Sequence, residues 1–237
     1  MTASITPRQE FVETIAANVR VVRARIAGAA ERAGREPAAV RLIGVTKTFP
    51  AEVCAAAVQA GLTELGENRV QEGVAKAEAL AEVGVRPTWH LIGHLQSNKV
   101  KPALGAFAVI HSVDSVDLAR AISRRAVAHV DVLLEVNVGG EATKFGFTSE
   151  ETPGALREIG TLSHVRVRGL MTVAPPGGAE SVRPVFRRLR ELAERLSLPE
   201  LSMGMSGDYE VAVEEGATMV RVGSALFGPR SAPGGTA

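Results

Sequence analysis

Eight short apolar runs alternate with helical segments along this chain, and no other feature limits its possible folds so strongly. The runs are rich in β-branched residues and apolar on both faces, as in strands of a sheet that helices cover. They lie at Leu42–Thr46, Thr63–Gly66, Trp89–Gly93, Val109–Val113, Val130–Val138, Val165–Val173, Leu201–Met205 and Met219–Gly223. Many segments between them open with Pro, Ser or Asp and several close with Gly, which is typical of helices.

Eight such β-α units in 237 residues favour a single (β/α)8 barrel of the TIM type over the rival doubly wound sheet. A long amphipathic helix precedes them, with Phe11, Ile15 and Val19 at helical spacing and Gly34 at its end. No stretch resembles a linker between domains. We therefore predict one domain over residues 1–230 and a disordered tail, SAPGGTA, over 231–237.

The composition excludes several classes of protein. A net charge of +1 gives no electrostatic reason to expect a nucleic acid or an anionic membrane as partner. No apolar run is long enough to span a bilayer, and the N-terminus lacks the pattern of a signal peptide. The single cysteine, Cys54, cannot form an internal disulfide, which fits a reducing compartment. We expect a cytoplasmic monomer.

Lys47 ends the apolar run LIGVTK, directly before a new helix begins at Pro50. In a (β/α)8 barrel the C-terminal ends of the strands meet at one mouth, where active sites lie. A lysine at a strand end is usually a solvated surface residue. Here the preceding strand would place the Lys47 amine at the inside of the barrel mouth. This position favours a nucleophile that can react with an aldehyde.

The last two strands indicate an anion site. Ser206 and Gly207 follow the seventh run just before a helix, and Gly223 and Ser224 follow the eighth. Glycine allows close backbone approach, serine supplies a hydroxyl, and the loops after these two strands commonly bind phosphate in barrels. Ordinary helix capping explains either segment alone, but both together favour a phosphate.

Arg221 interrupts the apolar run MVRVGSAL, and a buried arginine needs an acceptor. That acceptor is either a strand-end carboxylate, Glu67 or Glu135, or a group on a ligand. The sequence leaves both alternatives open.

Other polar residues near the strand ends carry weaker signals, and they include His90, His94, His111, Asp114, Asn137, Lys144 and Asp208. Lys144 is either a second amine near the ligand or a surface residue. No two histidines have metal-ligand spacing on one helix and no cysteine cluster exists, so we expect no metal site. Tyr209, the only tyrosine, is expected to have a packing or surface role.

An amine, a phosphate cradle and a cationic donor at one barrel mouth suit a ligand with an aldehyde, a phosphate and a basic ring nitrogen. Pyridoxal 5'-phosphate (PLP) has all three. From about Val40 to Gly228 the chain resembles the pyridoxal phosphate homeostasis protein family, relatives of the N-terminal barrel domain of alanine racemase. The resemblance rests on VTKTFP, GENRVQE, WHLIGHLQSNK, VNVGGEATKFGF, GLMTVAP and LSMGMSGDYEVAVEEGATMVRVGSALFG, in that order.

The resemblance implies that Lys47 holds PLP as a Schiff base. It also implies that Ser206, Gly223 and Ser224 hold the phosphate, that Arg221 faces the pyridine nitrogen, and that Asn68 contacts the cofactor at the rim. Two departures are minor. His94 stands where many relatives have proline, and Ser224 stands where threonine is frequent, so a hydroxyl is kept there.

The resemblance further implies a role in PLP homeostasis. PLP-dependent apoenzymes are candidate partners, and the sequence does not identify the recipient of any transferred PLP. A charged Arg221 opposite the ring nitrogen would weaken PLP as an electron sink. Alanine racemase adds a second domain with a tyrosine base, and this sequence shows no counterpart. We therefore expect a carrier or regulator without substantial turnover, not an enzyme. The alternative is a weak PLP-dependent amino-acid racemase or transaminase.

Overall fold

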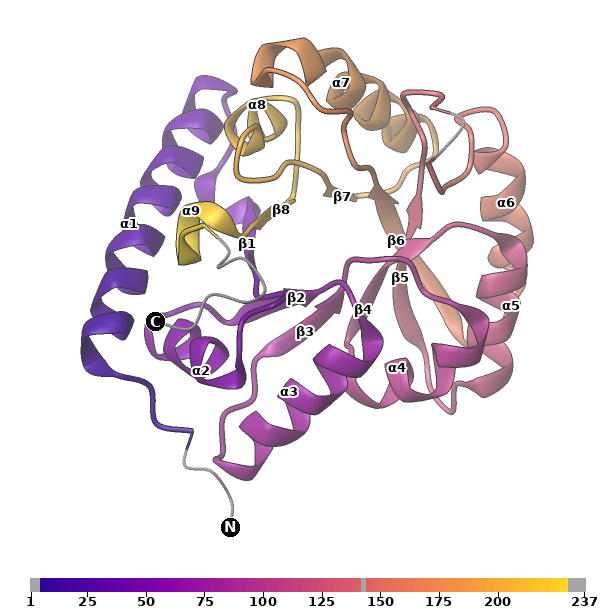
Figure 1. Cartoon of the computed structure of the whole chain (residues 1–237). Coiled ribbons are helices and arrows are strands. Elements are labelled where there is room, and N and C mark those ends of the chain that lie inside the picture. Colours follow the sequence, from indigo (N-terminus) through magenta and orange to yellow (C-terminus); the bar gives the residue numbers. More distant parts are fainter. Residues whose placement is uncertain (1–4, 142–143, 230–237) are drawn as a thin grey trace.

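The computed structural model describes residues 5–141 and 144–229 and shows a closed barrel of parallel strands (Figure 1). Within these ranges its eight strands are β1 (Arg41–Val45), β2 (Glu64–Glu67), β3 (Thr88–Leu91), β4 (Val109–Val113), β5 (Val130–Glu135), β6 (Val165–Met171), β7 (Glu200–Ser202) and β8 (Met219–Val222). Each strand pairs with the next, and β1 closes the barrel against β8 with Ile43 opposite Arg221. The predicted (β/α)8 fold is confirmed. The predicted tail, 231–237, lies outside the described residues.

Helices fill the connections and surround the strands (Figure 1). They are α1 (Gln9–Arg32), α2 (Ala51–Gln59), α3 (Val70–Glu82), α4 (Val100–Ala106), α5 (Val116–Arg125), α6 (Thr152–Ile159), α7 (Ala179–Arg195), α8 (Tyr209–Glu214) and α9 (Ser224–Phe227), with 3₁₀ turns η1 (Pro37–Ala39) and η2 (Ser97–Lys99). Within the described ranges, none of these helices is long and apolar enough to cross a membrane.

The predicted N-terminal helix is present as α1, drawn in indigo in Figure 1. Its buried face consists of Val12, Ile15, Val19, Val22, Ile26, Ala29 and Ala30. This face packs on α2, α8 and α9, where the end of the barrel meets its beginning. Asn18 Nδ2 also donates to the Leu226 carbonyl at 2.9 Å. The helix thus covers the closing seam of the barrel and supports the short turn after β8.

The buried hydrophobic residues of the described ranges form two separate clusters. The larger one fills the space between strands and helices. The smaller one consists of Ile43, Leu133, Met171 and Met219, which come from four different strands. Such a layer of inward side chains makes the barrel a packed core rather than a pore.

Several strands are shorter than the sequence predicted. The runs ending at Val138, Val173 and Met205 were each predicted as strand, but β5, β6 and β7 end at Glu135, Met171 and Ser202. Val136, Val138 and Met203 are nevertheless buried. Val173 and Met205, which end two of these runs, are partly exposed. Apolar sequence therefore follows burial only in part and does not mark where a strand ends.

We expect Gly169→Ala in β6 to lower the free energy of unfolding by about 3 kcal/mol or more. A Cβ at Gly169 would lie 1.8 Å from the Glu200 carbonyl oxygen, so β6 and β7 would have to separate. Gly105→Ala in α4 is the matched control, because a Cβ there meets nothing within 4 Å. It should stabilise the protein by roughly 0.5–1 kcal/mol. Urea unfolding of both variants measures the difference, and equal midpoints would contradict the expectation.

Candidate cofactor site

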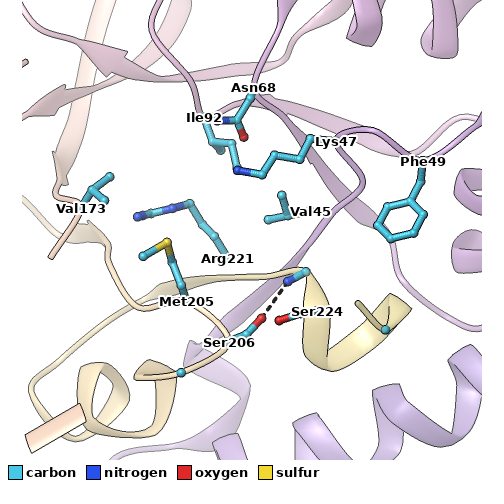
Figure 2. Close-up of a pocket in the computed structure, with 13 residues that line it drawn as sticks. Val45, Lys47, Phe49, Asn68, Ile92, Val173, Met205, Ser206, Arg221 and Ser224 are labelled. Carbon is cyan, nitrogen blue, oxygen red and sulfur yellow. Dashed lines mark hydrogen bonds between the residues drawn. The ribbon is translucent and has the colours of Figure 1, made fainter. Parts of the chain in front are cut away.

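A pocket of about 310 Å³ opens at the C-terminal mouth of the barrel (Figure 2). It is lined by all six residues that the sequence predicted as a binding site: Lys47, Asn68, Ser206, Arg221, Gly223 and Ser224. Its other lining residues are Val45, Phe49, Ile92, Val173, Met205, Gly207 and Gly228. The volume lies at the lower end of the range for small-molecule sites, and the walls combine apolar surface with a few polar groups, as such sites do.

Two cationic side chains enter this pocket from neighbouring strands. Lys47 follows the end of β1, and Arg221 comes from β8, which pairs with β1. Figure 2 shows both side chains reaching into the space bordered by Ile92, Val173 and Met205. The amine and the guanidinium therefore face one ligand-sized volume.

Arg221 is fully buried, and its hydrogen bonds go to neutral groups. It donates to Ser202 Oγ at 2.6 Å and to the Thr172 carbonyl at 2.9 Å. Burial lowers its pKa to about 10, against the attraction of Asp208 and Glu135. Within the described residues no carboxylate lies within ion-pair distance of Arg221, which removes the structural ion pair as an explanation.

A chain of polar groups runs from Arg221 through the barrel interior. Arginine can only donate, so the Ser202 hydroxyl accepts from it, and the proton of that hydroxyl is free to be donated to His111 Nδ1, 2.9 Å away. His111 then carries its proton on Nε2, which lies 2.9 Å from His90 Nδ1. His90 Nε2 in turn lies 2.9 Å from Glu64 Oε2. In this arrangement each of the two histidines carries one proton, on Nε2.

His90 and His111 are not rim residues, as their place near the strand ends had suggested. Both lie within strands and are fully buried. Burial, together with the positive charges of Arg221 and Arg41, holds the pKa of His111 well below its usual value. A neutral His111 is the form that the hydrogen-bond chain requires.

The expected phosphate end of the pocket is built from two loops. Ser206, in the loop between β7 and α8, accepts from the backbone N–H of Gly223 at 3.1 Å and of Ala225 at 3.4 Å. The hydrogen bond from Gly223, dashed in Figure 2, joins that loop to the turn after β8. The Ser206 and Ser224 hydroxyls therefore lie on the same side of the pocket. Asp208 lies outside the pocket lining and accepts from the Met205 N–H at 2.5 Å, so its role is to shape the loop.

Asn68 directly follows β2 and lines the pocket. Its side-chain oxygen is buried and has no hydrogen-bond partner within the described residues. A buried amide without a partner is costly, and a ligand in the pocket would satisfy it. This observation fits a polar ligand at the mouth.

Other polar residues of the mouth lie at its edge. His94 stacks on Phe145 with ring centroids 4.1 Å apart and contacts Asp114 at 3.0 Å. Lys144 pairs with Glu141 at 2.5 Å and donates to the carbonyl of Val173, a lining residue. Neither His94 nor Lys144 lines the pocket. Tyr209 is buried and packs in the core, and the described part of the chain contains no group of side chains suited to a metal ion.

Residues 12–231 match the family model described as alanine racemase, N-terminal domain. The chain is 49% identical to the pyridoxal phosphate homeostasis protein of Aquifex aeolicus, over 87% of this chain and 94% of the relative. It is 44% identical to the protein of that name from Pseudomonas aeruginosa, over 92% of this chain and 97% of the relative.

Solved structures agree with these matches. PipY of Synechococcus elongatus with PLP bound superposes with a TM-score of 0.78 at 38% identity, over 90% of this chain and 100% of the other. Alanine racemase of Clostridium difficile has a TM-score of 0.71 at 16% identity, over 93% of this chain and 57% of the other, and shows the shared fold. The chain belongs to the pyridoxal phosphate homeostasis protein family, whose barrel is that of the alanine racemase N-terminal domain.

Proposed function

We propose that this chain binds PLP as a Schiff base on Lys47 and serves in intracellular PLP homeostasis as a carrier or regulator, without substantial turnover. The observation that carries this proposal is the meeting of three groups in one pocket: the Lys47 amine, the buried Arg221 guanidinium and the Ser206–Gly223–Ser224 cradle. The PLP-bound structure of PipY and the names of the curated relatives support the same ligand and role.

Each part of PLP has a suitable partner. The Lys47 nitrogen would attack the aldehyde carbon, and water would leave as the C=N bond forms. Hydroxyls of Ser206 and Ser224 would bind the phosphate, and Gly223, which has no side chain, would let it approach the backbone closely. Arg221 would face the ring nitrogen, while the Asn68 side chain, whose oxygen has no partner among the described residues, would contact the cofactor at the rim. Bound PLP supplies an electron sink, and the residues supply binding and orientation.

The electrostatics of the pocket favour binding of PLP over catalysis with it. Arg221 donates only, so it would keep the ring nitrogen unprotonated and the electron sink weak. The chain also matches the homeostasis relatives over 94–97% of their length. The proposed recipients of PLP are apoenzymes that need it. The competing proposal is a weak racemase or transaminase.

The test is a visible absorption spectrum of the protein with PLP, followed by borohydride reduction and peptide mass spectrometry. The expected result is an imine band and a pyridoxyl group on Lys47. A protein that stays colourless and unmodified with added PLP would end the proposal. Incubation with amino acids then separates the two roles. Product formed faster than with free PLP would support the enzyme, and none would support the carrier.

Ser206→Ala is expected to weaken PLP binding about tenfold, as expected for losing one hydrogen bond to a charged group. Pyridoxal, which keeps the aldehyde but lacks the phosphate, should bind the variant and the parent equally. Ser123→Ala is the control, because Ser123 accepts from the His164 N–H at the opposite end of the strands. Spectroscopic titrations with both ligands give the affinities. An equal loss for pyridoxal and PLP would show that Ser206 does not act through the phosphate.

A further inference from the structure

The backbone directly after Lys47 is in an unusual conformation. Thr48 has a φ of 70°, in the left-handed region, although it is β-branched. Such residues rarely adopt this region, and they persist there only when surrounding contacts hold them. Because Thr48 is bonded to Lys47, whatever holds Thr48 also sets the direction in which the lysine leaves the strand.

Contacts from β2 and α3 hold the residues on both sides of Lys47. Glu72 Oε1 accepts from the Thr48 N–H at 2.6 Å. On the other side, Lys76 Nζ donates to the Thr46 carbonyl at 2.8 Å, and Glu67 Oε1 accepts from the Thr46 hydroxyl at 2.6 Å. The backbone is therefore fixed both before and after the lysine, with contacts to each neighbour.

The three holding groups also bind one another. Lys76 Nζ lies 2.7 Å from Glu67 Oε1 and 2.6 Å from Glu72 Oε1. The Glu67 side chain is fully buried and that of Lys76 nearly so, whereas that of Glu72 is 24% exposed. Burial acts to lower the pKa of Lys76, but its hydrogen bonds to the two carboxylates outweigh this and raise it. Lys76 stays charged and joins both carboxylates.

A buried charged cluster of this kind is poor evidence for stability alone. The desolvation of the charges opposes their attraction, and apolar residues often replace such clusters without loss. Fixing one conformation among several is a better-supported use of buried charges. In this molecule the charged groups fix the backbone at Thr46 and Thr48, the residues directly before and after Lys47.

We propose that Glu67, Glu72 and Lys76 form a clamp that holds the strained backbone at Thr48 and thereby points the Lys47 amine into the pocket. The inference rests on the proposed function of Lys47 as the point of PLP attachment. These three are positioning residues, since none of them lines the pocket. Their effect should fall on the formation of the imine and not on the binding of the rest of the cofactor.

Glu72→Ala tests the clamp, because Glu72 is its most exposed member and its loss leaves the buried Lys76–Glu67 pair in place. At saturating PLP the variant should form the imine at least tenfold more slowly. Its affinity for pyridoxine 5'-phosphate, which has an alcohol in place of the aldehyde, should change less than twofold. Glu72→Gln keeps an acceptor for the Thr48 N–H and should stay within threefold of the parent rate.

Glu78→Ala is the matched control, since Glu78 is an exposed glutamate on the same helix. It should behave as the parent protein. Imine formation at the parent rate in Glu72→Ala would overturn the inference, and so would an equal loss of imine rate and of pyridoxine 5'-phosphate affinity. A parent protein that forms no imine with PLP would instead overturn the proposed function, and the inference with it.

A second variant tests the role of strain. Glycine adopts a left-handed φ without steric cost, so Thr48→Gly removes the conformational strain that the clamp opposes. In the Glu72→Ala background it should restore the rate of imine formation at least threefold. A double variant as slow as Glu72→Ala would show that the clamp does not act on Thr48.

Discussion

We expect Lys47→Ala to form no imine with PLP at any concentration and to bind the cofactor at least about 100-fold more weakly, a loss of roughly 2.7 kcal/mol. The Lys47 side chain extends into the pocket at the end of β1 and is the only amine that lines it among the described residues. The phosphate cradle and Arg221 remain in the variant, so weak binding of PLP should persist. Absorption titration measures both effects, and a thermal melt checks that the barrel is intact.

Lys144→Ala is the control for this experiment, because Lys144 is a second amine at the edge of the same mouth. Its pairing with Glu141 and its bond to the Val173 carbonyl hold it outside the lining. The variant should form the imine as the parent does. A pyridoxyl group found on Lys144 in the reduced Lys47→Ala protein would show that attachment at Lys47 is not specific.

The sequence predicted the barrel because the alternation of apolar runs and helices is a local signal. It predicted β4 at its observed bounds, but it extended β5 to Val138, three residues past the observed end. Val136 and Val138 are buried, but β5 ends at Glu135 and Val136 pairs with Phe147 as an isolated bridge. Hydrogen-bond pairing between strands is set by the tertiary arrangement, and hydrophobicity along the chain does not report it.

The same distinction applies to the site. Lys47, Asn68 and Ser224 could be predicted to lie together because each follows a strand, and parallel strands in a barrel end at one mouth. The support beneath them could not be predicted. Lys76 looks like an ordinary helix residue in RVQEGVAKAEAL, and only the packing of α3 on β2 and β3 buries it. Glu72, four positions before Lys76, is its neighbour on the same helix, whereas Glu67 and the Thr46 carbonyl meet Lys76 only through the fold.

Arg221→Met is expected to leave the stability of the cofactor-free protein within about 1.5 kcal/mol of the parent. The pKa of Arg221, lowered to about 10 by burial, is a cost of roughly 3 kcal/mol to the folded state at neutral pH. The folded state binds the Arg221 proton less tightly than the unfolded chain does. The destabilisation is therefore present at neutral pH and decreases only as the pH rises above the lowered pKa. The hydrogen bonds of Arg221 to Ser202 and Thr172 stabilise the folded state by a similar free energy.

In contrast, the affinity of Arg221→Met for PLP should fall at least tenfold, or about 1.4 kcal/mol, because the partner of the ring nitrogen is lost. Arg183→Met should show the reverse pattern. Arg183 binds Glu180, Glu214 and Glu215 on the outside of the barrel, so its loss should reduce stability by about 1 kcal/mol and leave PLP binding unchanged. If Arg221→Met instead lost 3 kcal/mol or more with PLP affinity intact, Arg221 would be a structural residue. The expected pattern would mean that the fold tolerates a buried cation there because the ligand uses it.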